Sequence, residues 1–367
     1  MNVRGMKTSK VAIIGTAGIP AKYGGFETMA EYLTKELQNE IDITVYCSGK
    51  NYPETERIKV HNGARLIYLP MSANGIQSII YDIICILHAL LFADVLLVLG
   101  VSAGFMLPLV RLFSNRKIIT SIDGLEWKRN KWSKMARWFL WASEWCAVKA
   151  SHANIADNES IQDYTAMRYG KLSTIIEYGA DHVKSVVPQP ADYEKYPFLT
   201  KAYAVKVCRI EPENNIHIVL EAFSGLPGHN LVLVGNWNAS EYGRKLRQQY
   251  SSYSNIILLD PIYNQHDIDM LRSNAVLYIH GHSAGGTNPS LVEAMHLQLP
   301  VMAWGVNYNR TTTEGAARYF KNAEELRNHI RATRVKELKQ LGADMAEIAH
   351  RRYRWSVIAQ KYMHLIQ

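Results

Sequence analysis

The sequence predicts an α/β protein built from two doubly wound domains that face each other across a cleft. Apolar runs of strand length alternate with helical segments along most of the chain, a pattern typical of parallel sheets covered on both faces. A strand, a glycine loop and a helix follow one another near the N-terminus and again near residue 285. The chain has 367 residues, more than most single domains, so we expect two domains.

The first predicted domain spans residues 1–184. Its first strand, Lys10–Gly15, leads into a loop with three glycines, and apolar residues then recur at helical spacing from Phe26 to Leu37. The other strand-like runs of this domain are Ile43–Cys47, Leu66–Leu69, Val95–Leu99, Lys117–Ser121, Ala153–Ala156 and Thr174–Glu177.

Three prolines in the polar segment Val186–Pro197 predict a linker into a second domain at residues 185–345. A last helix, roughly Ala343–Leu365, is expected to carry residues 346–367 back onto the first domain. Ligands of such domains bind at the carboxyl ends of the strands. The strand-like runs of the second domain are Ala202–Cys208, Asn230–Val234, Asn255–Leu259 and Val276–Ile279.

The segment Ser78–Gly100 is long and apolar enough to suggest a membrane span, but it contains Asp82, His88 and Asp94. Because an Asp near a membrane centre costs about 2.5–3.5 kcal/mol, we expect a buried helix that ends near Phe92, followed by a strand.

Charge and cysteine usage narrow the class of protein. The net charge of +8 fits an anionic ligand or an acidic membrane surface, and no nucleic-acid-binding module is recognisable, so we expect no nucleic acid partner. The four cysteines lack metal-ligand spacing, which is typical of thiols in a reducing cytosol. The apolar run before Thr16 is too short for a signal peptide, so a cytoplasmic protein is expected. No oligomeric state is predicted.

The loop SAGGTNPSLVE, Ser283–Glu293, predicts an anion-binding helix start. Gly285 and Gly286 allow close backbone approach, while Asn288 suits an N-cap and Pro289 the first helical position. Glu293, about one turn further on, can accept hydrogen bonds from the vicinal hydroxyls of a ribose, a role separate from support of the core. The glycine loop and Glu293 together suggest a nucleotide diphosphate as the ligand. Such a loop can also merely connect a strand to a helix.

The N-terminal glycine loop, Thr16–Gly25, has a similar pattern. It does not fit a dinucleotide-binding site, because Gly15 and Gly18 lack the G-x-G-x-x-G spacing and the second strand ends in Cys47-Ser48, where an acid should meet the ribose.

Charged residues at two strand ends are candidates for catalysis. Arg209 can neutralise a departing diphosphate, or else it is a surface residue paired with Glu211 or Glu213. Asp123 can orient or deprotonate an acceptor hydroxyl. Glu126 either shares that role or lies in the first turn of a helix.

Five tryptophans between Trp127 and Trp145 are interleaved with lysines and arginines, a composition that suits an anionic bilayer surface as well as a core beside a solvated face. Trp138, Trp141 and Trp145 are spaced to share one helix face.

Two further polar clusters lie close to predicted strand or helix ends. His280 and His282 flank Gly281 before the glycine loop, and His282 is the better candidate for contact with a donor. Asp267 and Asp269 are explained by the start of a helix, so no metal site is predicted.

Taken as a set, six segments resemble GT-B glycosyltransferases of the large retaining family that uses nucleotide sugars (glycosyltransferase family 4-like), and more narrowly its bacterial rhamnosyltransferase-type branch. They are GTAGIPAKYGGFET (Gly15–Thr28), DGLEWKR (Asp123–Arg129), EYGAD (Glu177–Asp181), RIEPENN (Arg209–Asn215), GHSAGGTNPSLVEAM (Gly281–Met295) and NRTTTE (Asn309–Glu314).

This resemblance implies two Rossmann-like domains and a division of roles between them. It implies that Glu293 binds the donor ribose and that Arg209 neutralises the diphosphate. The other donor-binding residues that we assign are Gly18, Gly24, Gly25, His282, Gly286, Thr287 and Asn288, and the acceptor-side residues are Tyr23, Glu126 and Trp127.

Two positions depart from the family pattern. Gly285 stands where the family usually has a Glu that holds the donor sugar, which makes a deoxysugar such as rhamnose more plausible than glucose. Asn214 stands where it usually has a Lys, which leaves more of the diphosphate charge to Arg209.

The predicted function is therefore metal-independent transfer, with retention, of a sugar from a dTDP- or UDP-linked donor to a glycan or lipid-linked acceptor in bacterial surface polysaccharide synthesis. No cofactor is predicted, and the expected location is the cytoplasm, peripheral to the anionic inner face of the cell membrane. The alternatives are a noncatalytic nucleotide-sugar-binding subunit and, less well supported, an NAD-dependent oxidoreductase.

Overall fold

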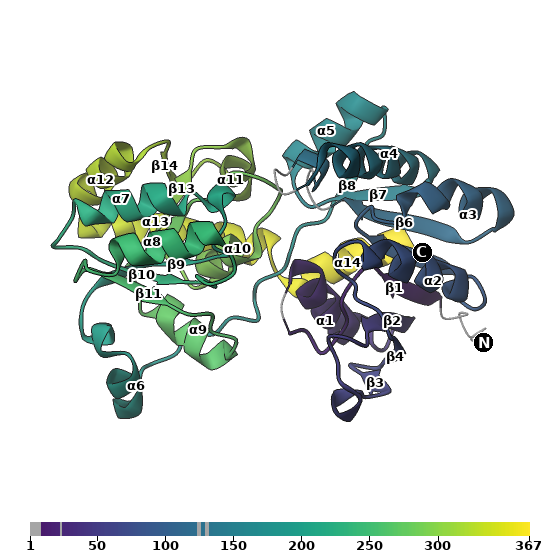
Figure 1. Cartoon of the computed structure of the whole chain (residues 1–367), viewed down its shortest axis with the longest axis horizontal. Coiled ribbons are helices and arrows are strands. Elements are labelled where there is room, and N and C mark those ends of the chain that lie inside the picture. The colour runs from purple at the N-terminus through teal and green to yellow at the C-terminus, as the bar shows by residue number, and fades with distance from the viewer. Residues whose placement is uncertain (1–8, 23, 123–125, 129–131) are drawn as a thin grey trace, which may run out of the picture. The chain divides into compact units, whose positions relative to one another are not determined.

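The chain folds into two compact units in a computed structural model that describes residues 9–22, 24–122, 126–128 and 132–367 (Figure 1). One unit consists of Met1–Tyr178 and Trp355–Gln367, and the other is Gly179–Arg354. Each is a largely parallel sheet with helices on both faces, which confirms the predicted α/β class with two Rossmann-like domains. The single helix predicted over Ala343–Leu365 is two helices, and the unit boundary falls between them.

The first unit contains an eight-stranded sheet of order β3-β4-β2-β1-β5-β6-β7-β8, in which β3 pairs with β4 antiparallel and all other pairs are parallel. Its strands are β1 (Lys10–Ile14), β2 (Asp42–Ser48), β3 (Val60–His61), β4 (Ala64–Leu69), β5 (Val95–Leu99), β6 (Lys117–Ile122), β7 (Ala153–Ala156) and β8 (Thr174–Ile175). Its helices are α1 (Gly25–Leu37), α2 (Gln77–Ala89), α3 (Leu107–Phe113), α4 (Lys134–Ala150), α5 (Glu159–Tyr169) and α14 (Trp355–Ile366), with 3₁₀ turns η1 (Glu54–Glu56), η2 (Gly104–Met106) and η3 (Glu126–Lys128).

Alternating side chains of the central strands fill two cores in this unit. Val11 and Ile13 of β1 pack with α1 and α14 on one face, whereas Ala12 and Ile14 pack with α2, α3 and α4 on the other. Since both faces are covered, β1 and β5 read as continuous apolar runs, which is why the sequence identified them.

The second unit contains a six-stranded parallel sheet of order β11-β10-β9-β12-β13-β14. Its strands are β9 (Tyr203–Val207), β10 (Asn230–Val234), β11 (Ile256–Leu259), β12 (Leu277–His280), β13 (Val301–Trp304) and β14 (Arg318–Phe320). Its helices are α6 (Pro190–Lys195), α7 (Ile216–Ser224), α8 (Glu241–Tyr250), α9 (Gln265–Ser273), α10 (Pro289–His296), α11 (Asn307–Thr312), α12 (Ala323–Ala332) and α13 (Val335–Arg352), with 3₁₀ turns η4 (Pro197–Thr200) and η5 (Pro212–Asn214).

Two strands at one edge of this sheet were not predicted. β13 and β14 have four and three residues, too short to give a clear period. The sheet is otherwise covered as expected, by α9, α10 and α13 on one face and by α7, α8 and α12 on the other.

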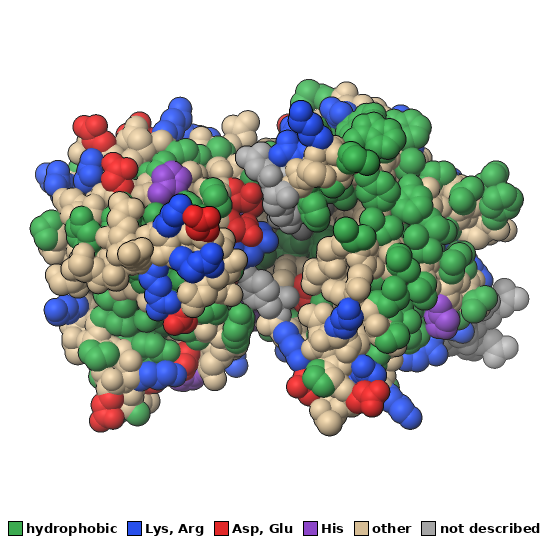
Figure 2. All heavy atoms as spheres, viewed as in Figure 1, with side chains coloured by type: hydrophobic (Ala, Val, Ile, Leu, Met, Phe, Trp, Pro, Cys, Tyr) green, Lys and Arg blue, Asp and Glu red, His purple; other side chains and the backbone are tan. Residues whose placement is uncertain are grey.

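The sequence suggested that helix α2 is buried on all sides, but one of its sides is exposed. Tyr81, Cys85 and Ile86 face the core, but Ile80 and Leu87 are each 51% exposed. Hydrophobic side chains gather on the surface over α2, α3 and α4 (Figure 2). None of the described helices combines the length and apolar character that a membrane span requires.

Asp82 of α2 gives a stability prediction. Its carboxylate is buried beside the Ser102 hydroxyl, and burial raises the pKa of Asp82 to about 7. The folded protein then holds a proton that the unfolded chain releases near pH 4, so stability falls as pH rises from about 4 to 7, by about 1.4 kcal/mol per pKa unit. Asp82→Asn should therefore raise the melting temperature markedly at pH 8 and little at pH 4. Asp94→Asn, at a half-exposed carboxylate, is the control. If Asp82→Asn changed the melting temperature equally at both pH values, the raised pKa of Asp82 would be contradicted.

Candidate active site

The strand order of the second unit reverses between β9 and β12, which lie side by side. In open parallel sheets, ligands bind beyond the carboxyl ends of the strands at such a reversal. Arg209 follows β9 and the glycine loop follows β12. The topology therefore brings together two segments that lie more than seventy residues apart in the sequence.

The glycine loop ends in a capped helix. Gly285 has φ +106°, a conformation that side chains rarely adopt, and a Cβ there would lie 3.3 Å from His282 Nε2. Asn288 is the N-cap of α10 and accepts a hydrogen bond from the Ser290 amide at 3.0 Å, and Pro289 opens the helix. This is the predicted N-cap, with Gly286 and Thr287 buried beside it.

Glu293 lies on α10 and is held by two basic side chains that sequence reasoning missed. Its Oε2 is 2.5 Å from Arg272 Nη2, and its Oε1 is 3.3 Å from His182 Nε2. Burial raises the pKa of the Glu293 carboxyl, but Arg272 and His182 outweigh burial, so the pKa lies below its ordinary value. Glu293 is thus part of a buried ionic cluster, which corrects the expectation that it does not support the core.

The strand-end segments of β9 and β12 are joined by hydrogen bonds. His282 Nδ1 lies 2.8 Å from Asn214 Oδ1, and Asn214 Nδ2 donates to the Arg209 carbonyl at 2.8 Å. Asn215 Nδ2 donates to the Gly281 carbonyl at 2.9 Å. Asn214, which stands where the resemblance predicts a Lys, therefore fixes His282 and the backbone of Arg209.

The Arg209 guanidinium is accessible. Its side chain is 42% exposed, and Nη1 lies 3.7 Å from Glu211 Oε1, too far for a strong hydrogen bond. The guanidinium can therefore turn toward a bound anion without leaving a buried partner unpaired.

A buried lysine, Lys206, lies beside Gly281 at the end of β12. Lys206 of β9 is 1% exposed, and burial lowers the pKa of its ammonium. Burial, together with Lys206 and His282, holds the pKa of His280 well below its ordinary value, so His280 is neutral at pH 7. A Cβ at Gly281 would lie 2.3 Å from the Asn214 carbonyl oxygen and 3.0 Å from Lys206 Nζ, so this position requires glycine. Sequence analysis did not select Lys206, although a lysine within the apolar strand β9 is unusual enough to have marked it.

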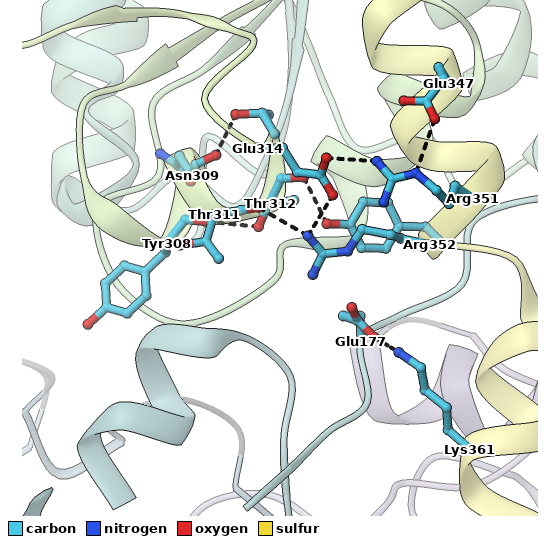
Figure 3. A network of polar contacts seen from close by, with 12 residues as sticks. Glu177, Tyr308, Asn309, Thr311, Thr312, Glu314, Glu347, Arg351, Arg352 and Lys361 are labelled. Atoms are coloured by element: carbon cyan, nitrogen blue, oxygen red, sulfur yellow. Dashed lines mark hydrogen bonds and ion pairs between the residues drawn. The ribbon is translucent and has the colours of Figure 1, made fainter. Parts of the chain in front are cut away.

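The NRTTTE segment is anchored at both ends, and Figure 3 shows the contacts of Glu314 at its C-terminal end. Asn309 Nδ2 donates to the His282 carbonyl at 2.9 Å, which ties α11 to the glycine loop. Glu314 accepts from Arg351 at 2.7 Å and from Arg352 at 3.1 Å, both at the end of α13. The same figure shows Lys361 of α14 paired with Glu177 at 2.5 Å within the first unit.

Asp267 and Asp269 each have partners of their own. Asp267, in the first turn of α9, pairs with Lys195 at 2.5 Å, and Asp269 accepts from the Lys184 amide at 3.1 Å. The N-cap itself is Asn264. Among the described residues, no group of three or more His, Cys, Asp or Glu side chains is arranged to hold a metal ion.

The glycine loop of the first unit is shaped differently from the loop of the second. Gly18 has φ +120°, and a Cβ there would lie 2.6 Å from Cys47 Sγ. The Ala17 amide donates to Glu27 Oε1 at 2.7 Å, the Gly18 amide to Thr16 Oγ1 at 3.1 Å, and the Ala21 amide to Glu31 Oε2 at 3.1 Å. These three amides already have partners and are not available to a phosphate.

The start of α1 has a glycine N-cap, and the carboxylate of Glu27 in its first turn lies beside Gly24. Gly24, with φ +126°, is its N-cap and makes no side-chain capping hydrogen bond, and Gly25 opens the helix. Such a terminus can offer amides and the helix dipole to an anion. Tyr23, Asp123 and the side chain of Glu126 lie outside the described residues.

Trp127 belongs to a packed aromatic cluster. Its Nε1 donates to the Tyr164 hydroxyl at 3.2 Å, and the Arg168 guanidinium lies 5.2 Å from its ring and 5.6 Å from that of Trp141. Trp138 and Trp145, in contrast, are 68% and 47% exposed. The three tryptophans lie on one side of the continuous helix α4, as their spacing predicted, but Trp141 is covered by Arg168 and the other two are exposed.

Two family models match adjacent parts of the chain. Residues 189–352 match glycosyl transferases group 1, and residues 8–181 match a domain of unknown function, DUF1972. No curated protein matches the sequence.

Solved structures with the same two-domain architecture cover nearly the whole chain. Sucrose-phosphate synthase from Thermosynechococcus elongatus has a TM-score of 0.81 at 17% identity, over 97% of this chain and 98% of that one. HepE of Anabaena, solved with UDP and glucose, has a TM-score of 0.73 at 16% identity over 97% and 98%. Starch synthase IV of Arabidopsis thaliana, solved with ADP and acarbose, has a TM-score of 0.72 at 13% identity over 98% of both chains.

These solved structures show that the chain has the GT-B fold, and its residues 189–352 match a glycosyl transferase family. The group 1 match covers Arg209, the glycine loop and Glu293, so the matched segment and the site at the reversal of the second sheet lie in the same part of the chain.

Proposed function

We propose that this protein transfers a deoxyhexose, with rhamnose the leading candidate, from a dTDP- or UDP-linked donor to a glycan or lipid-linked acceptor of a bacterial surface polysaccharide. The observation that carries the proposal is the donor site of the second unit. It combines an accessible Arg209, a glycine loop that ends in a capped helix, and the buried carboxylate of Glu293. These groups suit a diphosphate and a ribose.

The choice of a deoxysugar rests on Gly285. Its backbone conformation and the nearby His282 ring disfavour a longer side chain, so this position offers no carboxylate for a sugar hydroxyl. A donor that lacks that hydroxyl loses nothing there, whereas glucose leaves one polar group without its partner. HepE was solved with UDP-glucose, so UDP-glucose is the donor against which dTDP-rhamnose should be compared.

The reaction breaks the bond between the anomeric carbon and the diphosphate oxygen and forms a bond from that carbon to an acceptor oxygen. Arg209 and the amides of Gly286–Asn288 stabilise the negative charge that develops on the leaving diphosphate. The acceptor hydroxyl loses its proton to the donor phosphate or to Asp123. If the phosphate on the same face is the base, the configuration is retained.

A donor panel tests the proposal. Thermal unfolding is measured with UDP, dTDP, GDP and ADP, and then with their sugar conjugates. We expect stabilisation by UDP or dTDP and more by a deoxyhexose conjugate than by the glucose conjugate, with about 2.7 kcal/mol gained at 100 times the dissociation constant. Stabilisation by none of the nucleotides would refute the donor site, and a preference for the glucose conjugate would refute the deoxysugar.

A transfer assay separates an enzyme from a noncatalytic binding subunit. The parent should release nucleoside diphosphate in the presence of the donor and a membrane lipid extract, and this release should persist in excess EDTA. Donor binding without release from any acceptor fraction would favour the subunit. Loss in EDTA that magnesium restores would show that a metal site was missed.

A further inference from the structure

The outer surface of one helical layer in the first unit is unusually apolar. More than half of the exposed large hydrophobic side chains of the described chain lie on or beside α2, η2, α3 and α4, and hydrophobic side chains gather there in Figure 2. This surface, called here the α2–α4 face, consists of Ile76, Ile80, Ile84, Leu87, Leu91, Phe105, Leu109, Leu112, Phe113, Met135, Trp138 and Trp145.

These residues belong to one continuous layer. The inner sides of α2, α3 and α4 share a single core with β1 and β5, so their outer sides lie on the same face of the sheet. The Phe105 amide donates to Ser143 Oγ at 3.2 Å, and the Phe105 ring centroid lies 5.7 Å from that of Phe139, which fixes η2 against α4. The exposed side chains therefore form a preformed surface.

The charges on this layer favour an anionic surface as its partner. Among the described residues of α2, η2, α3 and α4, both carboxylates, Asp82 and Glu144, are buried. Arg111 and Lys134 are exposed among the apolar side chains. Adsorption to an anionic bilayer requires large apolar groups, interfacial aromatic side chains and basic residues without exposed acids. This layer offers all of them, including two exposed tryptophans.

We propose that the α2–α4 face binds an anionic lipid bilayer, with the apolar side chains in the headgroup region and no span. The inner sides of these helices are committed to the sheet, which limits insertion to the outer side chains. The anchor is thus centred on α2 and α3 rather than on the Trp127 segment, whose indole packs with Tyr164 and Arg168. This inference rests on the proposed function in one respect, namely that the acceptor is linked to a lipid.

Vesicle flotation tests the inference with vesicles of phosphatidylcholine alone and with phosphatidylglycerol added. The parent should bind only the anionic vesicles and should bind more weakly as salt is added. The variant Leu87→Gln, Leu109→Gln, Leu112→Gln, Phe113→Gln should bind at least about tenfold more weakly. The control is Val60→Gln, Leu172→Gln, Val335→Gln, which changes three exposed apolar residues elsewhere and should bind like the parent.

Thermal stabilisation by UDP and dTDP is measured on all three proteins to separate this inference from the proposed function. Equal stabilisation shows that the variants fold and keep the donor site. A parent that ignores anionic vesicles at low salt, or a variant that binds like the parent, overturns the inference and leaves donor binding untouched. A parent dimer that the variant abolishes, without vesicle binding, assigns the face to a second copy and also overturns it. Vesicle binding without any nucleotide binding would instead overturn the proposed function.

Discussion

Replacing Arg209 by Ala should lower turnover by about 10²-fold or more, equivalent to a barrier increase of about 3 kcal/mol. The guanidinium is exposed and only loosely paired with Glu211, so its removal leaves no buried charge and the fold should persist. The loss should therefore appear in the chemical step. The measurement is release of nucleoside diphosphate under single-turnover conditions, with unchanged thermal unfolding of the free protein.

Two further variants sharpen this test. Arg209→Lys should recover part of the loss, because an ammonium keeps the charge but cannot make a bidentate contact to the diphosphate. Glu211→Gln removes the partner of Arg209 at 3.7 Å and should change turnover by less than about threefold. An Arg209→Ala protein with near-normal turnover would show that the charge of the leaving group is neutralised elsewhere and would remove Arg209 from the catalytic site.

Replacing Glu293 by Gln should destabilise the protein by about 3–5 kcal/mol as well as weaken donor binding. The carboxylate holds Arg272 at 2.5 Å, and the Arg272 side chain is 5% exposed, so the substitution leaves a buried guanidinium without its counter-charge. Thermal unfolding with and without the preferred nucleotide measures both effects.

A second substitution separates the structural role of Glu293 from its binding role. In Glu293→Gln, Arg272→Met both partners of the buried pair are gone, and much of the lost stability should return. Donor affinity should stay low, because no carboxylate remains for the ribose. Glu347→Gln, at an exposed pair with Arg351, is the control and should cost at most about 1 kcal/mol. Full donor affinity in the double variant would remove Glu293 from the binding site.

Most of the fold and part of the site could be read from the sequence. Central strands such as β1, β5 and β10 are buried on both faces and appear as unbroken apolar runs, and Asn288-Pro289 is a local helix-start signal that needs no tertiary information. Gly24 and Gly285 both have a positive φ, a backbone conformation that favours glycine. Glycine at these two positions is therefore also a local signal in the sequence.

Contacts between distant segments decided the rest. His182 and Arg272 carry no local signal of their roles, since each matters only where the fold brings it beside Glu293. Lys206 is marked in the sequence as a lysine within an apolar strand, but its place beside Gly281 is set by the sheet. The same holds for α2, whose apolar sequence predicts burial but whose outer side is exposed because one face of the sheet can cover only one side of a helix. Local chain geometry is encoded by neighbouring residues, so the sequence alone determined the central strands, the Asn288 cap and the glycine loop before α10. Burial and charge pairing depend on residues far apart in the chain, so only the tertiary structure decided which charged groups meet and which apolar surface remains exposed.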